Sequence, residues 1–218
     1  MTLWCEWYLT VTYWFYYFSR FILWVTFRFG FGLEIRGREH VPRCGGVILA
    51  ANHTSYLDPP VLGAACPRRV SFMAKTDLFR HALLGAFMRG VHVIPLQRGE
   101  GDRSAIREAV KRLHCGDVVG IFPEGARQFS GRLGTAKRGV GLLAVLAKAP
   151  IVPVFIHGTF KALPPTGGGP RRSKIRIAFG HPIPYTMPSL PSRAHEEHLA
   201  AAVTQQWHEL AAQFHDDR

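Results

Sequence analysis

A histidine and an aspartate five positions apart are the first residues of this chain whose types and spacing point to chemistry. They lie in "NHTSYLD", residues 52–58, directly after the apolar run "VILAA". A carboxylate that holds one ring nitrogen of a histidine fixes its tautomer and stabilises the imidazolium, which suits a general base. Asp58 precedes a proline, so a tight turn is needed to fold it back onto His53. The plainer alternative is that Asp58 only caps the next helix and His53 only ends a strand.

Two further stretches carry polar residues of the same kind. Arg98 lies in "LQRG", while Glu124, Gly125 and Arg127 lie in "FPEGAR". "NHTSYLD" and "FPEGAR" each follow an apolar run, and ligands of open α/β sheets bind beyond the carboxyl ends of the strands. We therefore expect the three stretches to converge on one face, where guanidinium groups can bind a phosphate through paired, charge-assisted hydrogen bonds. The alternative for each arginine is a solvated surface charge.

The rest of the chain alternates short apolar runs with helical stretches, which predicts an α/β layered domain. Its sheet is expected to be largely parallel or mixed and to be flanked by helices. We expect strands at 33–37, 46–52, 69–75, 91–96, 117–122, 150–158 and 173–180, and helices at 59–66, 76–90, 102–116 and 140–149. A last helix is predicted by the apolar stripe Leu199, Val203, Trp207, Leu210 and Phe214.

The N-terminal 32 residues form a separate segment that holds more than half of the aromatic residues of the chain. The segment lacks the basic start and the small-residue cleavage site of a signal peptide. Since Trp and Tyr favour the headgroup level of a bilayer, we expect a membrane anchor, either a helix or a helical hairpin in one leaflet. A complete crossing is the alternative, although Arg20 would then lie inside the span. Arginines after the segment favour a cytoplasmic position for residues 33–218.

The motifs of the chain resemble those of a known enzyme family. "NHTSYLD" fits the N-H-x(4)-D motif of the glycerolipid acyltransferases, and "FPEGAR" resembles their F-P-E-G-T-R motif. "VIPLQR" between them and "IVPVFI" near the end agree in order and spacing. The chain thus resembles the bacterial 1-acyl-sn-glycerol-3-phosphate acyltransferase family over residues 33–185, with 33–218 as the acyltransferase domain and 1–32 as its anchor.

The resemblance implies a role for each matched residue. It makes His53 the base that deprotonates the acceptor hydroxyl and Asp58 the group that orients it. Pro153 belongs to the fourth motif, on the acyl-binding side. Ala126 and Gln128 depart from the family, which has threonine and often serine there, and this affects the identity of the acceptor. The residues that the resemblance assigns to glycerol-phosphate binding are Arg98, Glu124, Gly125, Arg127 and Lys137.

The implied reaction moves a fatty acyl group from an acyl-CoA or acyl-ACP thioester to the sn-2 hydroxyl of lysophosphatidic acid. No G-x-S-x-G motif is present to form an acyl-enzyme, and the thioester is the co-substrate of a reaction without other cofactors. His195 and His198 lack a third ligand nearby, so we expect no metal. The alternatives are another acceptor, such as a lyso-ornithine lipid, and a non-catalytic module that binds anionic lipid.

The partners and location follow from the same features. The formal charge of +12 requires an anionic partner, but the basic residues are dispersed rather than clustered, which argues against nucleic acid. We expect membrane phospholipid and lysophospholipid as partners, together with acyl-CoA or acyl carrier protein. The expected location is the inner membrane, with the catalytic domain facing the cytoplasm.

Overall fold

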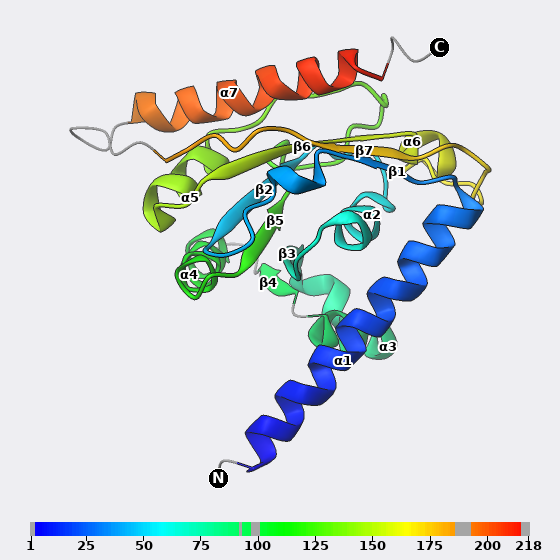
Figure 1. The fold of residues 1–218 in the computed structure, drawn as a ribbon, viewed down its shortest axis with the longest axis vertical. Helices are drawn as coiled ribbons and strands as arrows, with labels where there is room; N and C mark the ends of the chain where they lie inside the picture. The colour runs from blue at the N-terminus through cyan, green and yellow to red at the C-terminus, as the bar shows by residue number, and fades with distance from the viewer. Residues whose placement is uncertain (1–2, 92, 97–100, 186–192, 215–218) are drawn as a thin grey trace.

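A seven-stranded mixed sheet forms the centre of the computed structural model, which describes residues 3–91, 93–96, 101–185 and 193–214 (Figure 1). Its spatial order is β1-β7-β6-β2-β5-β3-β4, and every neighbouring pair is parallel except β6 and β7. The expected α/β sheet flanked by helices is therefore confirmed. The strands are β1 (Glu34–Arg36), β2 (Val47–Ala51), β3 (Val70–Lys75), β4 (Ile94–Leu96), β5 (Val118–Ile121), β6 (Ile151–His157) and β7 (Arg176–Phe179).

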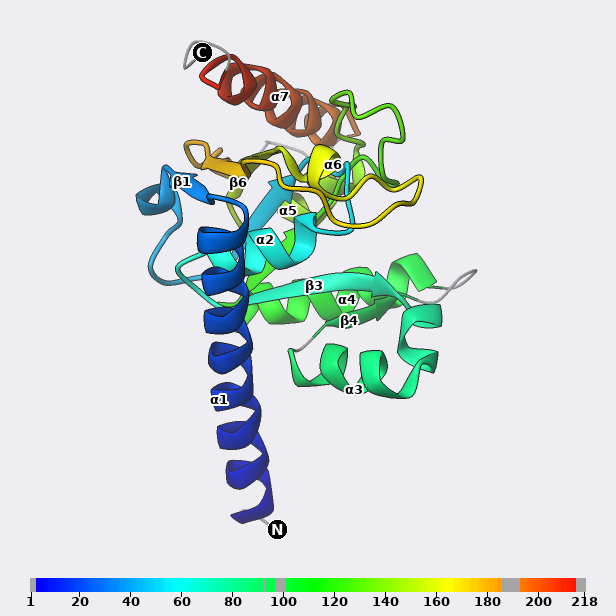
Figure 2. The ribbon, with the colours of Figure 1, turned by 90° about the vertical axis from the view of Figure 1, so that its right-hand side faces the viewer.

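Helices cover both faces of this sheet (Figures 1 and 2). The helices of the described residues are α1 (Leu3–Val25), α2 (Asp58–Ala65), α3 (Ala82–Gly90), α4 (Gly101–His114), α5 (Gly139–Ala147), α6 (Thr159–Ala162) and α7 (Arg193–Ala212). The helix expected over 76–90 is divided into a 3-10 turn at Thr76–Arg80 and α3. The division lies at His81, whose backbone is extended, with φ −74° and ψ 119°.

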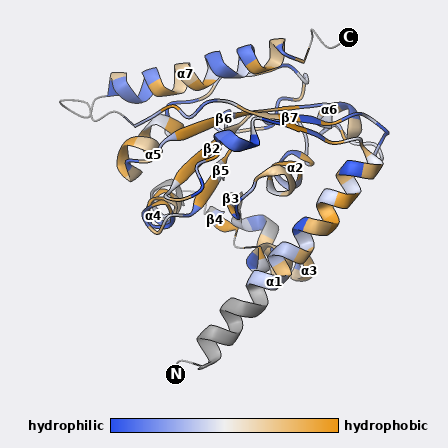
Figure 3. Cartoon of the chain, in the orientation of Figure 1, coloured by the Kyte–Doolittle hydropathy of each residue, from blue (hydrophilic) through white to orange (hydrophobic). Residues whose placement is uncertain are grey.

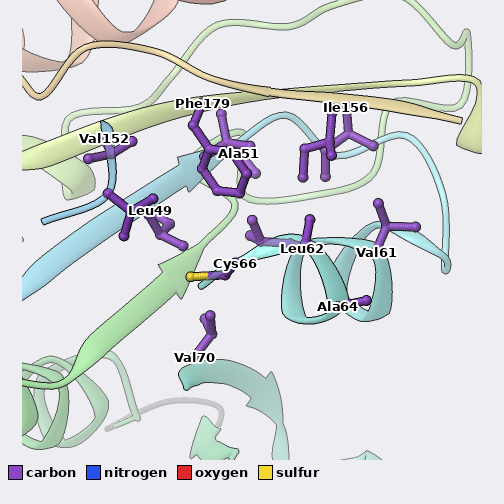
Figure 4. Close-up of a cluster of buried hydrophobic side chains, with 14 of the residues drawn as sticks. Leu49, Ala51, Val61, Leu62, Ala64, Cys66, Val70, Val152, Ile156 and Phe179 are labelled. Atoms are coloured by element: carbon purple, nitrogen blue, oxygen red, sulfur yellow. The ribbon is translucent and has the colours of Figure 1, made fainter. Parts of the chain in front are cut away.

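The alternation of side chains along β2 builds two cores. Val47, Leu49 and Ala51 face α2, where they pack with side chains such as Leu62 (Figure 4). Ile48 and Ala50 point to the opposite face, toward α4, α5 and α7. All five residues of β2 are buried, because the strand is covered on both sides. The buried strand expected from "VILAA" is confirmed, and it fixes the position of the residues that follow it.

The apolar stripe on α7 packs over the second core, as its spacing predicts. Leu199, Val203, Trp207 and Leu210 are buried, and so is Phe214 just beyond the helix. The indole Nε1 of Trp207 donates a hydrogen bond of 2.9 Å to the carbonyl oxygen of Ala50 in β2. The C-terminal helix is thereby attached to the central strand of the sheet.

Helix α1 extends away from the sheet and runs beside α2 and α3 (Figures 1 and 2). It is one continuous helix, followed by a π-helical turn at Thr26–Gly30, so residues 3–30 do not form a hairpin. Tyr16 is the buried contact of this helix: its hydroxyl accepts a hydrogen bond from the backbone N–H of Val70, and burial raises its pKa to about 12.

Several large apolar side chains on the described part of α1 are exposed, and the ribbon of this part shows orange segments between pale and blue ones (Figure 3). No helix among the described residues combines the length and hydropathy needed to cross a membrane. The large apolar side chains that are exposed between residues 13 and 25 of α1 are Tyr13, Trp14, Phe15, Phe18, Phe21, Ile22 and Trp24.

Candidate active site

The carboxyl ends of β2 and β5 meet at one edge of the sheet and bring two motifs together. The strands are parallel and pair Ala50 with Ile121, so His53 and Phe122 leave the sheet side by side. Their rings stack with centroids 4.2 Å apart. The backbone N–H of Gln128 donates a 2.8 Å hydrogen bond to the carbonyl oxygen of His53. The structure thus places "NHTSYLD" against "FPEGAR", as the strand-end argument predicts.

His53 and Asp58 form the hydrogen-bonded pair that this motif suggests. The ring nitrogen Nδ1 of His53 lies 2.9 Å from Oδ2 of Asp58. The carboxylate is fully buried, while the histidine side chain keeps 18% of its surface exposed. Because an ionised carboxylate only accepts, Nδ1 carries the proton and Nε2 is left with the lone pair. The geometry therefore provides a partly exposed, oriented imidazole with a free basic nitrogen.

The carboxylate of Asp58 also organises the turn that precedes it. Its Oδ2 accepts hydrogen bonds of 2.7 Å from the backbone N–H groups of Thr54 and Ser55. Asp58 is the first residue of α2, and no side chain caps that helix. The alternative that Asp58 serves only as an N-cap is therefore wrong, because its acceptor atom faces the turn and not the N–H groups of α2.

Hydroxyl groups brace the same turn from the other side. Ser55 Oγ donates to the carbonyl oxygen of Leu163 at 2.6 Å and accepts from the N–H of Leu57 at 3.1 Å. Thr54 Oγ1 lies 3.4 Å from Oγ1 of Thr159, at the start of α6. The motif is thus fixed to the segment after β6, so the His53 ring is held by its surroundings as well as by Asp58.

Asn52 is a residue of this site that the sequence reasoning missed. Its side-chain Oδ1 accepts from the N–H of Ile156 at 2.7 Å, and its Nδ2 donates to the carbonyl oxygen of Ile156 at 3.1 Å. The side chain extends the pairing of β2 with β6 where the backbone of β2 turns away. The available signal was a buried amide directly before His53, because a buried amide requires partners. Pro153, assigned to the fourth motif, lies in β6 opposite Ala50.

Glu124 is buried next to the backbone of His53. Among the described residues, no ion pair joins its carboxylate to an arginine. Burial raises the pKa of its carboxyl group, although Gln128 and the backbone N–H groups of His53 and Gly134 favour the charged form. The Gly134 N–H donates to Oε1 at 3.4 Å. The side chain is 3% exposed. This position suits a residue that holds the loop of residues 123–134 against the backbone of His53 better than one that contacts an acceptor substrate.

Two basic side chains lie close to the "PEGAR" turn. The guanidinium carbon of Arg127 is 3.6 Å from the centroid of the Tyr56 ring. Gly125 has φ +78°, and a Cβ placed on it would lie 2.9 Å from Nζ of Lys137. Gly125 is therefore favoured by its backbone angle, while Nζ is the mobile end of the Lys137 side chain. Arg98 lies outside the described residues, so its expected convergence stays a prediction.

No three His, Cys, Asp or Glu residues are grouped as metal ligands in the described part of the chain. The polar groups gathered at the site among the described residues include an imidazole, a buried carboxylate and nearby cationic side chains.

Comparisons with known proteins agree with these features. A sequence model described as Acyltransferase matches residues 32–157, more than half of the chain. A 1-acyl-sn-glycerol-3-phosphate acyltransferase of Bacillus subtilis is 30% identical over 183 residues, covering 82% of this chain and 88% of that protein. The alpha form of the Homo sapiens enzyme is 34% identical over 138 residues, covering 62% of this chain. The chain spans about half the length of the human and plant relatives it matches.

The fold has a solved counterpart. The crystal structure of a 1-acyl-sn-glycerophosphate acyltransferase from Thermotoga maritima superposes with a TM-score of 0.72. The superposition covers 94% of this chain and 83% of that one, at 23% sequence identity. At that identity the match shows the shared fold alone.

Proposed function

Because the chain belongs to the acyltransferase family, we propose that it transfers a fatty acyl group from an acyl-CoA or acyl-ACP thioester to the sn-2 hydroxyl of lysophosphatidic acid. The product is phosphatidic acid, and the free carrier thiol is released. The names of the relatives support this acceptor, and the hydrogen bond between His53 and buried Asp58 is the observation that carries the chemistry.

The pair supports direct attack on the thioester. Nε2 of His53 takes the proton of the acceptor hydroxyl while its oxygen forms a bond to the thioester carbonyl carbon. The carbon–sulfur bond then breaks, and the imidazolium returns the proton to the leaving thiolate. Asp58 stabilises the imidazolium between these steps, and general-base assistance of this kind typically contributes about 10²- to 10⁴-fold in rate.

Cationic groups beside the pair suit the acceptor phosphate. Arg127 can offer paired N–H donors, and Lys137 adds a charge beside Gly125. The backbone angle of Gly125 allows the loop to bring Lys137 close. Arg98 is assigned to the same phosphate on sequence grounds. Glu124 acts by fixing the loop against the backbone of His53.

The N-terminal helix is proposed to hold the enzyme at the membrane where its acceptor resides. The exposed aromatic side chains of α1 can enter one leaflet, with Trp and Tyr at headgroup depth. Leu83, Leu84 and Phe87 on α3 are exposed as well, and the Phe87 ring lies 6.0 Å from that of Phe15 on α1. Basic residues would add attraction to anionic headgroups. The proposed location is the inner membrane, with the catalytic domain in the cytoplasm.

The test is an acceptor and donor panel with detergent-purified protein. Lysophosphatidic acid is incubated with acyl-CoA or acyl-ACP, and the amounts of free thiol and phosphatidic acid are measured. The His53→Ala variant is assayed in parallel. We expect equal amounts of both products from the wild type and almost none from His53→Ala. Turnover of a lyso-ornithine lipid alone would reassign the acceptor. Binding of lysophosphatidic acid without thiol release from either donor would leave only the lipid-binding alternative.

A further inference from the structure

Tyr56 is an exposed residue of the catalytic turn to which neither motif chemistry nor the proposed mechanism gives a role. It lies between His53 and Asp58, and 58% of its surface is exposed. Its ring lies under the guanidinium group of Arg127, whose central carbon is 3.6 Å from the ring centroid. That separation is well inside the range of about 6 Å in which a cation is attracted by an aromatic face.

The turn that carries Tyr56 is fixed on both sides of it. Before it, the N–H groups of Thr54 and Ser55 bind Oδ2 of Asp58. After it, the N–H of Leu57 binds Oγ of Ser55. The ring therefore starts from a fixed backbone position, and the arginine that stacks on it loses freedom that it would otherwise keep in solvent.

Stacking leaves the hydrogen-bonding capacity of the arginine intact. The N–H bonds of a guanidinium group lie in its plane, whereas the ring contacts its face. Nη1 of Arg127 is buried and has no hydrogen-bond partner among the described residues. Arg127 is thus held in place by its face while donors at its edge stay available for an anion.

We propose that Tyr56 is a positioning residue that orients Arg127 for the phosphate of the acceptor. The inference rests on the proposed function, because it assigns Tyr56 to the phosphate-binding part of the same site. It also explains how the hydroxyl and the phosphate of one acceptor molecule are held at a fixed separation. The turn that holds His53 also carries Tyr56, whose ring positions Arg127. The hydrogen bond from the Gln128 N–H to the His53 carbonyl oxygen is a second link between the two segments.

The experiment compares Tyr56→Leu, Tyr56→Phe, Arg127→Ala and the double variant Tyr56→Leu/Arg127→Ala. KM for lysophosphatidic acid and kcat are measured at saturating acyl donor. We expect Tyr56→Leu to raise KM about two- to fivefold with little change in kcat, as loss of an exposed cation–π contact implies. Tyr56→Phe keeps the aromatic face and should behave as the wild type. Arg127→Ala should raise KM more than about tenfold, as loss of a charge-assisted hydrogen bond implies.

The double variant distinguishes action through Arg127 from an independent effect. If Tyr56 acts through the arginine, adding Tyr56→Leu to Arg127→Ala raises KM no further. An equal additional rise in that background would overturn the inference, as would a Tyr56→Leu variant with unchanged KM. An unchanged KM in Arg127→Ala would instead contradict the phosphate role of Arg127 in the proposed function. If Tyr56→Leu has a lower melting temperature than the wild type, the same measurements are made with Tyr56→Gln instead.

Discussion

The side-chain amide of Asn52 exchanges two hydrogen bonds with the backbone of Ile156, at 2.7 Å and 3.1 Å. Asn52 directly precedes His53, and Ile156 lies near the carboxyl end of β6. The amide therefore replaces the last pair of ladder hydrogen bonds where β2 leaves the sheet. The position of His53 thus depends on the side chain of the residue before it.

Replacing Asn52 with leucine should lower stability and activity together. The substitution keeps the branched shape, with methyl groups in place of the amide oxygen and nitrogen, but leaves the N–H and carbonyl of Ile156 buried without partners, which costs about 1–3 kcal/mol. Urea unfolding measures the loss as a lower midpoint with an unchanged slope. Thr54→Val is the control, since it removes only a 3.4 Å hydroxyl contact in the same turn. An Asn52→Leu midpoint equal to that of the control would contradict the assignment.

Removing the base should abolish turnover without unfolding the protein. His53→Ala is expected to reduce kcat by about 10²- to 10⁴-fold, which is the usual contribution of a positioned base. Asp58→Asn keeps an oxygen for the N–H groups of Thr54 and Ser55 but loses the charge that stabilises the imidazolium. It should therefore also lose rate at a similar melting temperature.

His40→Ala is the matched control for the pair. His40 bonds through Nδ1 to the carbonyl oxygen of Phe179, and its ring lies tilted against that of His181. No ion pair between His40 and a carboxylate is found among the described residues. Its kcat should remain within about twofold of the wild type, as for substitutions outside a site. A His53→Ala variant that retained more than a tenth of the wild-type rate would refute the general-base role.

Gly125→Ala should destabilise the "PEGAR" turn and weaken acceptor binding. A side chain at φ +78° costs about 1–2 kcal/mol, and its Cβ would displace Nζ of Lys137. Acceptor KM should therefore rise. Gly139→Ala is the control, because that glycine begins α5 and a Cβ there meets nothing within 4 Å. Equal melting temperatures and KM values for the two variants would show that the turn tolerates a side chain.

Glu124→Gln should change how stability depends on pH. Burial raises the folded-state pKa of Glu124 above its unfolded value, so the folded protein binds this proton more tightly than the unfolded chain. The stabilisation is present below the unfolded pKa and is lost as pH rises through the raised folded pKa. Glutamine has no charge to desolvate, so the variant should lose this decline and melt higher at neutral pH. Melting temperatures between pH 4 and 8 test it, and parallel curves would contradict it.

Charges on the apolar face of α1 should release the protein from membranes. Trp14 and Phe18 are 69% and 65% exposed, so the double variant Trp14→Glu/Phe18→Glu disturbs no described core. Loss of two aromatic rings that insert into the bilayer in the proposed bound state should weaken vesicle binding by more than about tenfold. The measurement is co-sedimentation with phosphatidylethanolamine and phosphatidylglycerol vesicles. Leu146→Glu, exposed on α5, is the control, and equal binding by both would contradict the proposed anchor.

The strands and helices that carry the site were predictable because their signals are local. The buried run before His53, the stripe on α7 and the loop after Phe122 each follow from periodicity and turn residues, and the structure confirms them. The division at His81 was not predictable in the same way. The pattern of apolar and polar residues over 76–90 is continuous and gives no sign that His81 is extended. The contact of Gly85 with the backbone of Phe79 is likewise visible only in the folded chain.

The sequence by itself determined which residue types are available at the strand ends and, through its motifs, the family. Only the tertiary structure decided how they are used: that Asp58 faces back into its own turn, that Glu124 is buried beneath His53, and that Tyr56 supports Arg127. The reason for the last two is physical, because each of these contacts depends on where two separate segments emerge from a parallel sheet. The order of the strands sets that position, and this order is not written in local periodicity.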